Sequence, residues 1–324
     1  MLSRIADSMY WMARYLERAD NTARLLEINL LHLVEAEDSV NEAAQWRPLL
    51  AIAGAEESYE ECYGTKAVTG PKVIRFLTQE TCNTNSIRSC IRSARENART
   101  VRDRISREMW EVMNDLWLGL DARLKTDLAP ERATDFYGSI RDAVAHFHGE
   151  TVATMMRGEA FSFYLLGTFL ERADMTARIV DVKYHLLLPD ISLVGSPLDY
   201  YQWQALLKSL SGYEPYRRLY HTGLRPLDLW QFVVFEKAFP RSLRFSLDHM
   251  ATALHMIDPD CQGEGSCQAL QELLSGLDEH TPDSSFTLGP HEFLEQLLDR
   301  IERVHGALVV DYFQSQMGDW PCAS

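Results

Sequence analysis

Two segments of the chain place acidic and basic side chains in the same order. The segment YLERADNTARLLE begins at Tyr15, and FLERADMTARIVD begins at Phe169. Carboxylates can transfer protons, and guanidinium groups bind carboxylate or phosphate through paired hydrogen bonds. The pattern therefore indicates acid–base or anion-binding chemistry. The candidate residues are Glu17, Arg18, Asp20 and Arg24, and at the matching positions Glu171, Arg172, Asp174 and Arg178.

These charges are expected to border a buried helical seam. At about 100° per residue, Glu17 and Arg24 lie on one line of a helix, with Asp20 beside them. A buried carboxylate costs several kcal/mol unless it is paired, so we expect pairing with arginines four to seven residues later. Arg18 and Arg172 point away from this line and are expected to serve a different contact.

Two interpretations of the seam stay open. In the first, two ionic networks fix the register of the helices where two halves of the molecule meet. In the second, two polar clefts hold a ligand or a charged group of a partner. Buried ion pairs provide specificity in some proteins, and no nucleophile marks either segment.

A stripe of arginines occurs once, in the run SIRSCIRSARENARTVRDRISR at residues 86–107. Its members fall within about 40° of one line on a helix, and they are Arg88, Arg92, Arg95, Arg99 and Arg102. At the matching positions of the second half, the first arginine survives as Arg244. The others are replaced by Asp248, Ala251, His255 and Asp258.

The stripe also has two interpretations. It could be a solvated face, or it could neutralise the seam carboxylates Glu17, Asp20 and Glu27. Alternatively, it could be an anion site, because arginine makes bidentate contacts with phosphate or carboxylate. Loss of the stripe in the second half implies that such a site is single.

The elements that position these residues are predicted to be helices. Apolar residues recur at a helical period over 3–35. Further helices are expected over 84–120, from Pro130 to about residue 156, and from after Gly158 to Pro189. In the second half, helices are expected near 198–211, 226–237, 240–258, 265–278 and 290–315, with loops at 258–266 and 279–290. No alternating strand pattern occurs, so the fold class is all-α.

The sequence predicts a tandem repeat. Glu17 matches Glu171 at an offset of 154, and Tyr59 matches Tyr216 at an offset of 157. A register kept over the whole length predicts two duplicated helical-bundle units, residues 1–157 and 158–324, related by an approximate twofold axis.

Composition excludes several classes of protein. The 324 residues carry a net charge of −15, which argues against nucleic-acid binding. No signal peptide or membrane span is expected, so the protein is predicted to be cytoplasmic. Its six cysteines are therefore expected to be reduced thiols. They are Cys62, Cys82, Cys90, Cys261, Cys267 and Cys322.

No cofactor or metal is expected from the motifs. A di-iron bundle needs two Glu-x-x-His pairs, and Glu302 with His305 is the single match in the sequence. His148 and His305 match each other in the repeat and are expected to be hydrogen-bonded packing residues. Four tryptophans are expected in the core, and they are Trp11, Trp46, Trp203 and Trp230.

Glu17-Arg18, Glu171-Arg172 and the run ARENAR at residues 94–99 resemble the alpha-E family, a bacterial all-helical family named for its recurring Glu-Arg motif. The family's "NPxSI"-like turn is kept loosely, as NTNSI at residues 83–87 and FPRSL at residues 239–243. Such proteins are encoded beside circularly permuted ATP-grasp proteins and transglutaminase-like proteins. The resemblance therefore implies a system that forms or trims amide bonds on peptides, and it carries over no catalytic residue.

Three functional hypotheses follow. The leading one is a non-catalytic or co-catalytic partner of an ATP-grasp-type amide ligase that presents a peptide or anionic substrate. Here the seam charges would shape a docking cleft and the arginine stripe would hold an anionic group. The second is an enzyme that uses Glu17 or Glu171 as general acid or base, with arginines as anion clamps. The third is a structural scaffold whose charges lock the two units together.

Overall fold

The computed structural model describes residues 3–35, 42–64, 68–126, 128, 130–185, 196–221, 223–261 and 264–314. Within these ranges every regular element is a helix, which confirms the all-α prediction. None of the described helices combines the length and apolar character needed to cross a membrane. Pro189 and Cys322 lie outside the described residues.

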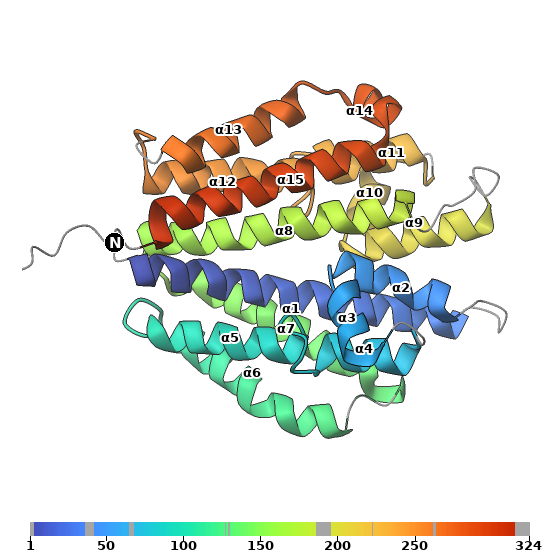
Figure 1. Cartoon of the computed structure of the whole chain (residues 1–324), viewed down its shortest axis with the longest axis horizontal. Helices are drawn as coiled ribbons and strands as arrows, with labels where there is room; N and C mark the ends of the chain where they lie inside the picture. Colours follow the sequence, from blue (N-terminus) through green and yellow to red (C-terminus); the bar gives the residue numbers. More distant parts are fainter. Residues whose placement is uncertain are drawn as a thin grey trace, which may run out of the picture.

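The first half is built around one long helix, α1, which packs against α5 and α7 (Figure 1). Helix α6 packs against α5 and α7 in turn, and shorter helices surround the far end of α1. The bounds are α1 Ser3–Glu35, α2 Glu42–Ile52, α3 Glu56–Tyr63, α4 Gly70–Thr78, α5 Ile87–Thr100, α6 Arg107–Thr126 and α7 Pro130–Thr154.

The second half is built around α8, which packs against α12 and α15, and α13 packs against those two helices. A π-helical turn, Gln231–Phe235, follows α11, and another, Val309–Phe313, follows α15. The bounds are α8 Glu159–His185, α9 Pro197–Ser209, α10 Tyr213–Leu219, α11 Pro226–Trp230, α12 Leu243–Ile257, α13 Glu264–Asp278, α14 Pro282–Leu288 and α15 Pro290–Leu308.

The two long helices, α1 and α8, run side by side in the same direction through the middle of the molecule (Figure 1). They are in close contact at Gly167, where an added Cβ would lie 2.2 Å from the carbonyl oxygen of Tyr10. A glycine is required there because the obstacle is backbone, which cannot rotate away. The apolar stripe of α1 is fully buried at this contact, with Met9 and Leu16 both 0% exposed.

Local signals explain where the inner helices begin. Ser86 caps α5 by accepting a hydrogen bond from the backbone nitrogen of Ser89, and Ser242 caps α12 by accepting one from Phe245. Serine at this position satisfies a backbone donor that the first turn would otherwise leave unpaired. The two caps occupy matching positions in the two halves, so α5 and α12 start at the same level.

Two sequence predictions about these elements were wrong. The expected long helix over 84–120 is divided into α5 and α6, because a turn follows Thr100 and the Ser106 hydroxyl accepts a hydrogen bond from the Met109 nitrogen. The expected loop over 279–290 contains α14, which starts with a capping box between Thr281 and Ser284. The short helices α2, α3, α4 and α10 were not expected.

The expectation of reduced cysteines was wrong for two residues. Cys62 at the end of α3 and Cys82 after α4 form a disulfide. The bond joins the exposed end of α3 to the exposed segment between α4 and α5. Cys90, Cys261 and Cys267 are free thiols.

Candidate functional site

The two Glu-Arg pairs meet at the α1–α8 contact and bind each other crosswise. Arg172 donates from Nε and Nη2 to the two carboxylate oxygens of Glu17, both at 2.9 Å. Arg18 donates in the same way to Glu171, at 2.5 and 2.9 Å. Both glutamates are 1% exposed. Each half therefore supplies the carboxylate of one bidentate pair and the guanidinium of the other.

Each glutamate is also bound by a second arginine, which comes from a different element in each half. Arg14, one turn before Arg18 on α1, donates to Glu171 at 2.8 Å. Arg241, just before α12, donates to Glu17 at 3.1 Å and to Asp20 at 2.7 Å. Each buried carboxylate thus faces two guanidinium groups, which compensates for its removal from water.

Within each segment, the aspartate pairs with the arginine one turn later, as expected. Arg24 contacts Asp20 at 3.0 Å, and Arg178 contacts Asp174 at 2.9 Å. Arg24 also donates to the hydroxyl of Ser211 in the other half, at 2.6 Å. These arginines therefore attach each long helix to surrounding structure as well as to its own carboxylate.

We call this cluster the ER seam (Arg14, Glu17, Arg18, Asp20, Arg24, Glu171, Arg172, Asp174, Arg178 and Arg241), and burial and charge together fix the protonation of its two glutamates. Burial alone would raise the pKa of Glu171, but Arg18 and Arg14 lower it to about 2. For Glu17, Arg172 and Arg241 likewise outweigh burial and hold the pKa well below its usual value. A general acid or base works best with a pKa near the operating pH. These enclosed, permanently ionised carboxylates lack that property.

The matched histidines are hydrogen-bonded to matched tyrosines, as expected of packing residues. The Tyr10 hydroxyl and His305 Nδ1 lie 2.9 Å apart, and Tyr164 contacts Nδ1 of His148. Burial, together with the charge of Arg14, lowers the pKa of His305 to about 4, so this ring is neutral. His148 Nε2 lies 3.4 Å from the Glu17 carboxylate.

Four arginines of the stripe lie on α5 and Arg102 lies in the turn that follows it, and the stripe is directed away from the seam. Arg88 pairs with Asp121 of α6 at 3.0 Å, and Arg95 donates to Asn114 of α6 at 3.0 and 3.1 Å. Arg99 pairs with Glu96 on its own helix at 2.7 Å. The suggestion that these arginines neutralise the seam carboxylates was therefore wrong.

Three members of the stripe, Arg92, Arg99 and Arg102, are exposed. The side chain of Arg99 is 68% exposed, and Arg92 is exposed without an ion pair or hydrogen bond to the described residues. Arg95 and Arg102 lie over the ring of Trp110, at 5.6 and 5.7 Å from its centre. We call Arg92, Arg95, Arg99, Arg102 and Trp110 the α5 outer face.

The remaining candidates and carboxylates lie apart from this face. Arg244 is the counterpart of Arg88, and it binds Asp248 on α12 at 3.0 Å and Asp278 on α13. Glu27 on α1 pairs with Arg141 of α7. The structure thus brings the two Glu-Arg segments together, but it separates them from Arg88, Arg92, Arg95, Arg99 and Arg244.

Sequence reasoning missed Arg14 and Arg241, which complete the seam. A signal for Arg14 was present, because it stands one helical turn before Arg18 and therefore on the same side of α1. For Arg241 the signal was its position next to the capping Ser242, where the first half has Asn85. Asn85 accepts a hydrogen bond from Arg18, so both positions serve the seam.

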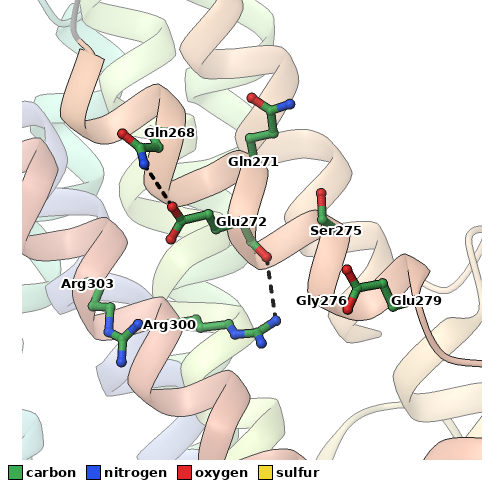
Figure 2. Close-up of a pocket in the computed structure, with 8 residues that line it drawn as sticks. All are labelled: Gln268, Gln271, Glu272, Ser275, Gly276, Glu279, Arg300 and Arg303. Atoms are coloured by element: carbon green, nitrogen blue, oxygen red, sulfur yellow. Dashed lines mark hydrogen bonds between the residues drawn. The ribbon is translucent and has the colours of Figure 1, made fainter.

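A polar hollow of about 400 Å³ lies between α13 and α15 on the surface of the second half (Figure 2). Gln268 donates to Glu272 at 2.9 Å, and Arg300 reaches the backbone oxygen of Glu272 at 3.5 Å. Charges of both signs line it, Glu272 and Glu279 together with Arg300 and Arg303. In the described part of the chain, no group of three or more His, Cys, Asp or Glu side chains is placed to hold a metal ion.

Three of the four tryptophans lie in the core as expected, with Trp46, Trp203 and Trp230 at most 3% exposed. Trp11 is partly buried and packs against the same core. Arg14 lies over its ring, 4.7 Å from the centre. These rings are therefore packing residues and do not form an open stacking platform.

Residues 1–313 match the model of a family described as a predicted alpha-helical domain with a conserved ER motif. Uncharacterized proteins of Mycobacterium bovis and Mycobacterium tuberculosis are each 21% identical over 324 residues, covering 94% of this chain. The chain spans 35% of the length of those relatives. No solved structure matches it. The family match covers nearly the whole chain and includes both Glu-Arg pairs, so the chain belongs to the alpha-E family.

Proposed function

We propose that this protein is a helical accessory partner of an ATP-grasp-type amide ligase system that acts on peptides. In this role the ER seam locks the two halves together, and the α5 outer face docks an acidic surface of the ligase. A transglutaminase-like protein is a further candidate partner. The family's genomic neighbours motivate the choice of partner.

The observation that carries the proposal is the different environment of the two sets of arginines. In the seam, each buried carboxylate is bound by two guanidinium groups. On α5, Arg92 and Arg99 face solvent in a chain of net charge −15. Arginine is enriched at protein interfaces, and complementary charge accelerates association.

The length of the relatives also supports a role beside other domains. The mycobacterial proteins carry the alpha-E region in chains roughly three times as long as the match, since the match covers 35% of them. In those relatives the matched region therefore adjoins other sequence, and this supports a role beside other domains.

We further infer that residues 1–157 and 158–324 are two copies of one duplicated unit related by an approximate twofold axis. The crossed pairs Glu17–Arg172 and Arg18–Glu171 support this, because such an axis exchanges one pair for the other. The packing order supports it as well. Helix α1 packs against α5 and α7, and α6 packs against those two; in the same way α8 packs against α12 and α15, and α13 packs against those two.

The test is a binding measurement between the purified chain and the ATP-grasp protein encoded beside it. Arg92→Glu/Arg99→Glu should weaken binding at least about tenfold, because charge reversal replaces attraction by repulsion. The matched control is Arg218→Glu/Arg303→Glu, which makes the same charge change at exposed positions of α10 and α15. Equal affinity for the two folded variants, or no binding by the wild-type chain, would refute the proposal.

A further inference from the structure

We propose that a tyrosine-lined pocket at α10 binds an acidic peptide. The choice of a peptide as ligand rests on the proposed function above. The pocket has a volume of about 340 Å³ and lies between the start of α9, one face of α10 and the residues after it. Its side chains include four tyrosines, an arginine and a histidine, and they are Tyr200, Tyr213, Tyr216, Tyr220, Arg217 and His221.

The floor of this pocket is rigid. Tyr216 is buried, and its hydroxyl donates to the carbonyl of Gly223 at 2.9 Å while accepting from the backbone nitrogen of Arg225 at 3.3 Å. Its ring stacks on Tyr220 at 4.9 Å and meets the edge of Phe232 at 5.5 Å. The tyrosine hydroxyl therefore fixes the path of the chain after α10, and the pocket is formed before any ligand arrives.

The charge of the pocket opposes the charge of the protein. Among the described residues that line it, two are basic, Arg217 and His221, and none is acidic. Arg217 is exposed, and its guanidinium lies 5.8 Å from the ring centre of Tyr213. A basic recess in a chain of net charge −15 favours a ligand that carries carboxylates.

The corresponding surface of the first half keeps the aromatic floor and differs in charge at one helix position. The ring centres of Tyr59 and Tyr63 on α3 lie 5.1 Å apart, and those of Tyr216 on α10 and Tyr220 directly after it lie 4.9 Å apart. At the offset of 157, however, Glu60 stands where α10 has Arg217. The aromatic floor is thus common to both halves, and the basic group that could recognise a carboxylate occurs on α10.

The mixture of side chains favours a peptide. Tyrosine and arginine dominate the energetics of protein recognition, and tyrosine presents a large rigid surface with few torsions to order. The volume lies within the range of small-ligand sites. An aromatic or apolar residue of the ligand would pack on the tyrosine rings, and a neighbouring carboxylate would pair with Arg217.

The experiment is fluorescence polarisation of the purified full chain with fluorescein-labelled Glu-Glu-Phe-Glu-Glu. The neutral peptide Gln-Gln-Phe-Gln-Gln is the ligand control. Arg217→Glu should weaken binding of the acidic peptide about tenfold or more, since it removes a charged hydrogen bond to the ligand carboxylate and puts a like charge in its place. Arg218→Glu is the matched protein control, because it changes the adjacent exposed arginine, which does not line the pocket.

Tighter binding of the acidic peptide, lost in Arg217→Glu and kept in Arg218→Glu, is the expected result. Equal affinity for the two peptides, equal loss in the two variants, or no binding by the wild-type chain would overturn the proposal. The assay contains no ligase, so its outcome is separate from the proposed partnership. If the ligase-binding test fails while selective peptide binding is retained, the proposed partnership is rejected and the proposal for the pocket stands.

Discussion

The ER seam and the outer faces of the molecule differ in how far the two halves resemble each other. In the seam, Glu17–Arg172 and Arg18–Glu171 form nearly the same bidentate geometry. On the outside, α5 presents arginines where α12 presents Asp248, Ala251 and His255, and α10 presents Arg217 where α3 presents Glu60. The inner contacts are repeated, whereas the outer surfaces have separate chemistries.

The difference suggests separate roles for the two regions: the seam stabilises the fold, and the outer surfaces contact partners or ligands. A contact that joins two similar halves works best when both halves supply the same groups, since each carboxylate then meets a guanidinium. A partner or ligand of a single kind needs one complementary surface. We therefore assign stability to the seam and binding to the surfaces that differ.

The largest effect is expected from removing one seam carboxylate. Glu171→Gln leaves Arg14 and Arg18 buried without their counter-ion, and Glu17→Gln does the same for Arg172, while Arg241 keeps its pair with Asp20. Breaking a buried ion pair by removing one partner costs about 3–5 kcal/mol. Urea unfolding should show this loss for both variants. A loss for one variant but not the other would contradict the equivalence of the two halves of the seam.

A smaller loss is expected where the two long helices touch. Gly167→Ala places a methyl group against the Tyr10 carbonyl oxygen, so α1 and α8 must separate, at a cost of about 1–3 kcal/mol. Gly149→Ala in α7 is the control, because no atom lies within 4 Å of an added Cβ there. That variant should be stabilised by roughly 0.5–1 kcal/mol through helix propensity. Similar effects of the two substitutions on the free energy of unfolding would contradict the close contact.

Acid should weaken the seam in two steps. The pKa of His305 falls from 6.5 to about 4 in the fold, so protons bind the unfolded chain better and stability declines as the pH drops from 6.5 towards 4. The pKa of Glu171 falls from 4.5 to about 2, so its contribution is complete above pH 4.5 and is lost towards pH 2. Urea unfolding at a series of pH values measures both steps, and His305→Gln should remove the first. If His305→Gln loses as much stability between pH 6.5 and pH 4 as the wild type does, that loss belongs to another group.

The smallest effect is expected from an ion pair on the outside. Arg107 and Glu111 on α6 lie 2.6 Å apart, with side chains 79% and 52% exposed. Solvent screens an exposed pair, so that it contributes little to stability, and Glu111→Gln should hardly change the free energy of unfolding. If Glu111→Gln lowered the free energy of unfolding as much as Glu171→Gln does, the distinction between seam and surface ion pairs would be contradicted.

The sequence was sufficient for the long inner helices and for the two Glu-Arg segments. Periodic apolar residues predicted α1 over its whole length, and the i, i+4 pairs Asp20–Arg24 and Asp174–Arg178 follow from helical geometry alone. The break between α5 and α6 was missed because the arginine pattern continues through it. The capping Ser106 was a local signal for that break.

The crossed pairing could not be read from one segment. Glu17 and Arg18 point to different sides of α1, so each segment alone suggests two separate contacts. They form one cluster because α8 lies parallel to α1 at a register set by Gly167 and Tyr10. The direction of the α5 arginines also depended on tertiary structure, since α6 supplies Asp121 and Asn114. Sequence periodicity identifies the residues that share one face of a helix. The packing of helices that are distant in the sequence determines what that face contacts.

The most direct test of the locking role is a double-mutant cycle across the α1–α8 contact. The free energy of unfolding would be measured for the wild type, Glu17→Gln, Arg172→Gln and the double variant. A structural pair in direct contact predicts a coupling energy towards the upper end of about 0.5–3 kcal/mol, because the second substitution costs little once the first is made. Additive losses, with a coupling energy near zero, would contradict the claim that the crossed Glu-Arg pairs join the two halves.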